Sequence, residues 1–147
     1  MSQPTMDSWR PNLAIDFDGV IHSYEDGWQG GKIYGKVIPG FFEWALKAKK
    51  LFTLVIYSSR SGSHKMRKPM EDFIKVELQG WLWDEERDGR RQPLSFHDFT
   101  FASYKLPTFL TIDDRAIMFK GNWNAPELDP EQLIKFKPWN QQEDYST

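Results

Sequence analysis

Carboxylates near the start of the chain have the type and spacing that metal or phosphate chemistry requires. Asp16 and Asp18 are separated by one residue, follow the apolar run Leu13-Ala14-Ile15 and precede a glycine. Side chains alternate between the faces of a strand, so both carboxylates are expected on one side. Carboxylates so close together repel each other, and such a pair normally persists because a cation lies between them. A solvated strand-to-turn junction, where Asp-Gly is common, explains this stretch equally well.

A second acidic pair and two further polar groups occur near the ends of later apolar runs. Asp113 and Asp114 follow one run, Ser58 follows another, and Lys105 lies just before the run that ends at Asp113. The carboxyl ends of parallel strands share one edge of a sheet, so groups distant in sequence can meet there. Taken alone, each group has an ordinary explanation as a turn cap, a helix cap or a solvated lysine. Their order at three strand ends favours a shared site.

Hydrophobic patterning predicts the alternating strands and helices that would bring these groups together. We expect strands over 12–17, 51–57, 97–103 and 109–112, and helices that begin near Pro39 and Pro69. Strands that alternate with helices form a parallel sheet covered on both faces. The chain has 147 residues with no internal repeat or linker. The prediction is one α/β domain over 1–147, loose at 1–10 and 141–147.

The other segments also have predicted structures. The stretch Gly19–Gly40 contains six glycines and two β-rich patches, which predicts a hairpin or flap. This flap would be the only element able to cover Asp16, and its His22 is expected to be exposed. An edge strand is expected over 116–119. Asp129 opens a last short helix as its cap, with Pro130 at the first position and Leu133, Ile134 and Phe136 turned inward.

Composition narrows the class of function. A net charge of −2 gives no strong electrostatic argument for a nucleic-acid partner, and the absence of cysteine excludes disulfides and thiolate sites. The aromatic content of 16% fits an aromatic substrate mouth, a homo-oligomer interface or a core filled by large side chains. No apolar run approaches the roughly 20 residues that cross a bilayer, and no signal-peptide core is found. We therefore expect a cytoplasmic protein without membrane association.

Together, the motifs resemble those of the haloacid dehalogenase superfamily, a large group dominated by phosphatases. Residues 15–20 (IDFDGV) are similar to its first motif, Ser58 to its second and residues 111–115 (TIDDR) to its fourth. Lys105 is the best-placed candidate for the third motif, a lone lysine. The resemblance implies a three-layer α/β/α Rossmann-like parallel sheet. The chain leaves no room for an inserted cap domain, so it looks like the small capless members found in bacteria and phages.

The resemblance implies a magnesium-dependent phosphomonoester hydrolase that acts through an aspartyl-phosphate intermediate. Asp16 would be the nucleophile. Asp18 would protonate the leaving oxygen and then activate water. Mg²⁺ would be held by Asp16, by the backbone carbonyl of Asp18, and by Asp113 or Asp114.

Phosphate binding is also implied for several residues. The Ser58 hydroxyl would bind a phosphoryl oxygen with help from backbone N–H groups of the turn at Ser59, and Lys105 would neutralise negative charge. Arg60 could contact substrate or pair with a surplus carboxylate, and the pairing role is favoured. Trp28 could stack on a base or sugar. The expected substrate is a phosphorylated small molecule or nucleotide, with a phosphorylated nucleic-acid end as a further candidate.

Three other functions stay open on the residues alone. A small metal-dependent nuclease also clusters carboxylates at strand ends, but it would need another one where this chain has Ser58-Ser59-Arg60. A receiver-type signalling module would carry an acceptor aspartate after the middle strand, where none occurs. A non-catalytic phosphate-binding module on the same fold is the third alternative.

Overall fold

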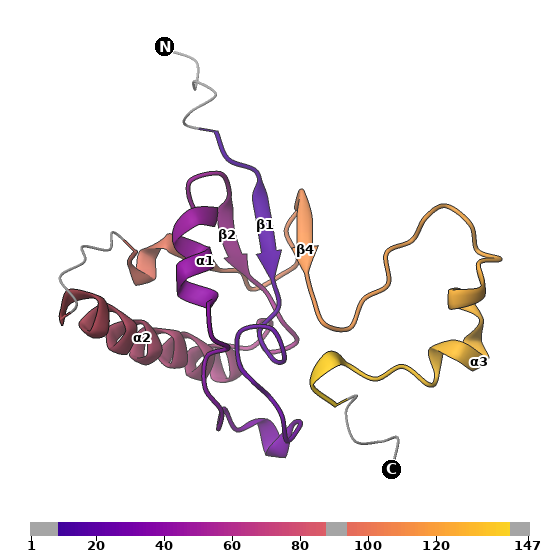
Figure 1. Ribbon diagram of the computed structural model, residues 1–147, viewed down its shortest axis with the longest axis horizontal. Helices are drawn as coiled ribbons and strands as arrows, with labels where there is room; N and C mark the ends of the chain where they lie inside the picture. Colours follow the sequence, from indigo (N-terminus) through magenta and orange to yellow (C-terminus); the bar gives the residue numbers. More distant parts are fainter. Residues whose placement is uncertain (1–8, 88–93, 142–147) are drawn as a thin grey trace.

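A parallel sheet forms the centre of the protein (Figure 1). The computed structural model describes residues 9–87 and 94–141. Its strands are β1 (Asn12–Ile15), β2 (Thr53–Ile56), β3 (Phe99–Phe101) and β4 (Leu110–Ile112), in the order β3-β2-β1-β4. All neighbours are parallel, and Ile15 pairs in register with Ile56 on one side and Ile112 on the other. The residues that follow these three strands therefore start from one edge of the sheet.

Two helices, α1 (Phe41–Ala48) and α2 (His64–Arg87), pack against one face of this sheet. Leu13 and Ile15 pair with Leu54 and Ile56, so the four side chains share that face and enter one hydrophobic cluster with both helices. Burying a side chain of this kind contributes about 1.5–3 kcal/mol. No helix within residues 9–87 and 94–141 has the length and apolar character needed to cross a bilayer.

The opposite face of the sheet carries Ala14, Val55, Thr100 and Thr111. The helix α3 (Pro130–Leu133) is exposed throughout and lies away from the sheet (Figure 1). Among the described helices, α1 and α2 thus form a single layer on the sheet. The α/β class and the parallel sheet are confirmed, whereas a second helical layer stays a prediction.

Helix α1 begins near Pro39, as predicted, whereas α2 begins earlier in the chain than the predicted start near Pro69. Helix α1 begins at Phe41 behind Gly40, whose φ of 92° suits a residue without a Cβ. Helix α2 begins at His64, and Pro69 lies inside it. Proline removes one backbone hydrogen bond there. The helix continues past Pro69, and the residues Met70, Ile74 and Leu78, at 0–2% exposure, form a buried stripe that packs it against the core.

The chain after β4 differs most from the prediction. Residues 116–119 form no strand, although the cap of α3 is as predicted, because Asp129 accepts a hydrogen bond from the Glu131 N–H at 3.1 Å. The predicted inward orientation of Leu133, Ile134 and Phe136 was wrong, because these residues are 38%, 85% and 45% exposed. Their spacing predicted a buried side, but this segment runs outside the sheet (Figure 1).

The glycine-rich flap has one short antiparallel contact between its arms and no continuous hairpin ladder, with backbone hydrogen bonds from the Ser23 N–H to the Lys36 carbonyl and from the Ile38 N–H to the Ile21 carbonyl. Its pairings are the isolated bridges Asp18–His22 and His22–Val37, with a short 3-10 turn at Gln29–Gly31. The prediction of an exposed His22 was wrong, since this ring is fully buried and stacks on Phe17 with the ring centres 5.6 Å apart. The flap therefore folds around an imidazole.

Candidate functional site

Three carboxylates meet at the carboxyl edge of the sheet. Asp16 follows β1, whereas Asp113 and Asp114 follow β4, and each offers an oxygen within 4.8 Å of the others. The Asp16 N–H donates to the Ile112 carbonyl at 2.9 Å, which extends the β1–β4 ladder by one residue and ties the two strand ends together. The sheet topology thus brings together acidic groups that are far apart in sequence.

The cluster has an unbalanced negative charge. The pKa of Asp16 is raised to about 8, chiefly because burial removes water and also because Asp113 and Asp114 repel the charged form. Burial likewise raises the pKa of Asp114. The Asp114 Oδ1 atom is buried without a hydrogen-bond partner among the described residues. A divalent cation would offset this charge and supply the missing partner, and carboxylate oxygens are the ligands that Mg²⁺ prefers, so the residues fit such an ion.

Gly19 is required where the flap leaves this cluster. Its φ is 83°, and a Cβ at this position would collide with the Asp114 carboxylate. Both the backbone conformation and the close approach therefore call for glycine.

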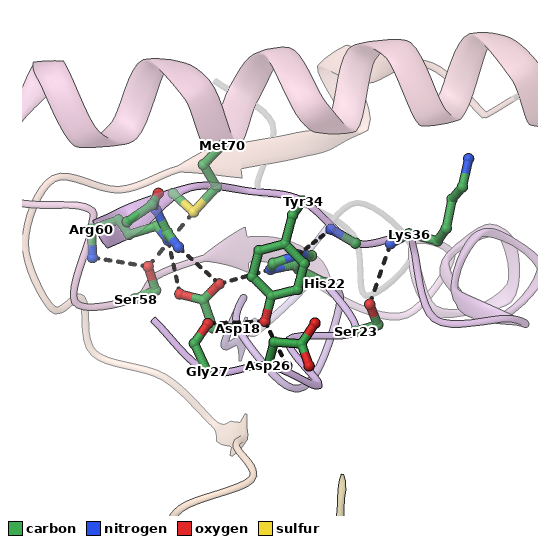
Figure 2. Close-up of polar contacts among 12 residues, drawn as sticks. Asp18, His22, Ser23, Asp26, Gly27, Tyr34, Lys36, Ser58, Arg60 and Met70 are labelled. Carbon is green, nitrogen blue, oxygen red and sulfur yellow. Dashed lines mark hydrogen bonds and ion pairs between the residues drawn. The ribbon is translucent and has the colours of Figure 1, made fainter. Parts of the chain in front are cut away.

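Asp18 does not join the cluster, contrary to the alternation expected for a strand. Its carboxylate accepts hydrogen bonds from Arg60 Nε at 2.8 Å and Nη2 at 3.1 Å, and from His22 Nδ1 at 3.0 Å (Figure 2). The strand ends at Ile15, and the N–H groups of Ile21 and His22 both donate to the Phe17 carbonyl. A turn therefore replaces the strand before Asp18, which directs this side chain elsewhere.

The surroundings of Asp18 compensate its charge. Burial is the largest influence and would raise the pKa, but the hydrogen bonds from His22 and Arg60 together lower it below the ordinary value. The His22 Nε2 atom accepts from the Gly35 N–H at 2.9 Å, so the proton lies on Nδ1, facing Asp18. Asp18 was predicted to ligate the metal through its backbone carbonyl, and that role stays a prediction because the contacts of Arg60 and His22 engage the carboxylate only.

Arg60 is a buried ion-pair partner. Its side chain is 2% exposed, donates to the Gly31 carbonyl at 2.7 Å in addition to Asp18, and lies 4.8 Å from the Trp28 ring. The favoured pairing role is therefore what the structure shows, and a substrate contact would require Arg60 to leave Asp18. Trp28 is 44% exposed, with the guanidinium on its ring.

The predicted phosphate-binding groups lie in two different places. The Ser58 hydroxyl is buried, accepts from the Arg60 N–H at 3.0 Å and donates to the Met70 sulfur at 3.6 Å, whereas Ser59 is exposed. Lys105 is exposed and lines a cavity of about 340 Å³ on the other face of the sheet, together with Asp113. Lys105 thus shares a cavity with Asp113, whereas the Ser58 hydroxyl is engaged in its own turn.

Sequence reasoning missed the C-terminal residues of the site. Trp139 Nε1 donates to the Gly19 carbonyl at 2.7 Å, and Asn140 Nδ2 donates to the Ser23 carbonyl at 2.9 Å. A C-terminal segment that was not expected near the flap therefore contacts it, while the covering of Asp16 by the flap stays a prediction. A tryptophan in a polar segment without periodicity was the only signal that pointed to it.

Comparison with known proteins adds no relative from which a function could be transferred. No protein-family model, curated protein or solved structure matches the chain. The geometry of the site is thus the basis for the function proposed below.

Proposed function

We propose that the protein is a magnesium-dependent phosphomonoester hydrolase of the haloacid dehalogenase type, which acts through an aspartyl-phosphate on Asp16. The observation that supports this most is the cluster of Asp16, Asp113 and Asp114, with a raised Asp16 pKa and a buried, unpartnered Asp114 oxygen. The fold of that family, with a helical layer on each face of the sheet, belongs to the same proposal.

The chemistry assigned to Asp16 begins with attack of its carboxylate oxygen on phosphorus. A bond from oxygen to phosphorus forms, the bond to the leaving oxygen breaks, and that oxygen takes a proton. When bound by Asp16, Asp113 and Asp114, Mg²⁺ would supply positive charge against the carboxylates and the phosphate. Lys105, which lines the same cavity as Asp113, would add a cation at the same edge.

Asp18 is proposed to donate the proton to the leaving group and then to activate water. In the structure its carboxylate is held by Arg60 and His22. A phosphate accepts the same paired hydrogen bonds from a guanidinium as a carboxylate does. We therefore propose that the phosphoryl group takes over Arg60 and frees Asp18 for proton transfer.

Asp16→Asn is the decisive test. We expect the folded variant to lose phosphate release from a panel of phosphorylated sugars, nucleotides and oligonucleotides with Mg²⁺, because an amide cannot form the acyl-phosphate. Asp18→Asn should be nearly as damaging, and Ser58→Ala and Lys105→Ala less so. Asp129→Asn, at the exposed cap of α3, serves as the matched control. Steady-state turnover by Asp16→Asn would exclude the covalent mechanism.

The principal alternative is a metal-dependent nuclease, which could use the same cluster of three carboxylates. Incubation of supercoiled plasmid with the protein and Mn²⁺ separates the two activities. Nicking by the wild type, lost in Asp16→Asn, together with no release of phosphate from monoesters, would favour the nuclease.

A further inference from the structure

The C-terminal segment returns to the candidate site after a long excursion. Beyond β4 the chain runs outside the sheet and comes back to the flap at residues 138–141 (Figure 1). Pro138 is buried, and Trp139–Gln141 form a short 3-10 turn. The hydrogen bonds of Trp139 and Asn140 to flap carbonyls fix this return at two points.

The bond from Trp139 places an indole beside the reactive groups. Its acceptor, Gly19, directly follows Asp18 and approaches Asp114 so closely that a side chain would not fit. The indole N–H is therefore bonded to the residue that directly follows Asp18. That residue, Gly19, in turn lies against the Asp114 carboxylate of the cluster.

The ring of Trp139 is anchored but open. The polar atom of its ring is satisfied, yet the residue is 56% exposed. A tryptophan that stabilises a core buries most of its ring. Trp28, the stacking candidate from the sequence, differs because the guanidinium of Arg60 lies on its ring. Of these two indoles, Trp139 has the ring surface less occupied by protein groups.

We propose that Trp139 is a substrate-binding residue of this site and that it stacks on the base of a nucleoside monophosphate whose phosphate lies at Asp16. This inference rests on the proposed function, since it places the phosphate at the carboxylate cluster. Base–aromatic stacking contributes about 1–3 kcal/mol, which a sugar phosphate without a ring system does not gain. The net charge of −2 gives no general attraction to a polyanion, which favours a mononucleotide over a nucleic acid.

The test compares two substrates that share a phosphoester but differ in the base, adenosine 5′-monophosphate and ribose 5-phosphate, with Mg²⁺. Trp139→Leu retains apolar bulk and removes the stacking surface, whereas Trp139→Phe retains an aromatic ring and loses the N–H donor. Trp123→Leu is the matched control, because Trp123 is 79% exposed on the same excursion and packs on Phe119. Melting curves establish that each variant is folded.

We expect Trp139→Leu to raise the KM ratio of nucleotide to ribose 5-phosphate about tenfold, the factor that 1.4 kcal/mol of stacking gives. Trp139→Phe should change this ratio much less, and Trp123→Leu should leave it unchanged. An equal effect of Trp139→Leu on both substrates would show that Trp139 only fastens the flap and would overturn the inference. A selective loss for a 5′-phosphorylated oligonucleotide, with none for the mononucleotide, would overturn it as well.

Nucleotide binding separates this inference from the proposed hydrolysis. Isothermal titration of adenosine 5′-monophosphate into Asp16→Asn with Mg²⁺ needs no turnover. If this binding weakens in Asp16→Asn/Trp139→Leu while the wild type hydrolyses no monoester, the hydrolase proposal fails and the nucleotide site stands. If the wild type hydrolyses monoesters and binding is unaffected by Trp139→Leu, the nucleotide site fails and the hydrolase stands.

Discussion

Asp16 and Asp18, separated by a single residue, have opposite electrostatic surroundings. Asp18 is surrounded by donors, with Arg60 and His22 hydrogen-bonded to its two oxygens, and its pKa is lowered. Asp16 is next to two further carboxylates, and its pKa is raised to about 8. The fold thus compensates one charge with its own cation and leaves the other uncompensated.

This difference indicates which carboxylate needs a partner from outside the chain. A buried charge persists only when it is paired, hydrogen-bonded, bound to a metal or neutralised by a proton. Asp18 meets this requirement within the protein. Asp16 meets this requirement by holding a proton or by sharing a cation with Asp113 and Asp114. We therefore expect Asp16 and Asp18 to respond differently to mutation, metal and pH.

A large effect is expected from Arg60→Met, which leaves the half-buried Asp18 charge with His22 as its remaining side-chain partner among the described residues. Breaking one partner of a buried ion pair costs about 3–5 kcal/mol in the free energy of unfolding. Chemical denaturation measures this loss, and Asp18→Asn in the Arg60→Met background should recover part of it. Lys68→Ala, which breaks a solvent-exposed pair with Asp72, is the control. A loss no larger than that of Lys68→Ala would show that Arg60 does not stabilise Asp18.

A smaller stabilisation is expected when Mg²⁺ is added. An ion that binds only the folded state adds about 2.7 kcal/mol at one hundred times its dissociation constant. Melting curves in EDTA and in increasing Mg²⁺ measure it. The increase should disappear in Asp113→Asn and persist in Asp129→Asn. An unchanged melting temperature of the wild type at every concentration would contradict the metal site.

The third effect is expected in the pH dependence of the metal-free protein, where coupled carboxyls can share one proton and so relieve part of their repulsion. The pKa of Asp16 rises from 3.8 in the unfolded chain to about 8 on folding. Its contribution to stability is therefore fully present below about pH 4 and is lost as the pH rises through 8. Melting temperatures in EDTA should fall from pH 5 to pH 8, and less so in Asp16→Asn. A wild-type melting temperature that rises over this range would contradict the assignment.

The parts of the site that depend on topology could be predicted from the sequence. Apolar runs indicated the parallel strands, and the common edge of such strands is enough to place Asp113 and Asp114 beside Asp16. The direction of the Asp18 side chain was not predictable in this way, because alternation ends with the strand and a turn begins at Phe17.

Two features were missed because they arise from single long-range contacts. The burial of His22 depends on hydrogen bonds to Asp18 and to the Gly35 N–H, and an isolated loop histidine gives no sign of either. The return of Trp139 to Gly19 joins residues separated by most of the chain. Periodicity describes which side of an element is apolar and carries no information on such contacts.

The position of β4 at the edge of the sheet has a consequence for the order of folding. Leu13 pairs with Leu54 on one side and with Leu110, much later in the chain, on the other. Contacts between distant residues are slow to form, because a long loop must close first. The Arg60–Asp18 pair needs only the first part of the chain, whereas the Asp16 cluster needs β4. A chain emerging from the ribosome can therefore form the Arg60–Asp18 ion pair well before it acquires a metal site. Metal binding would then require that β4 has joined the sheet.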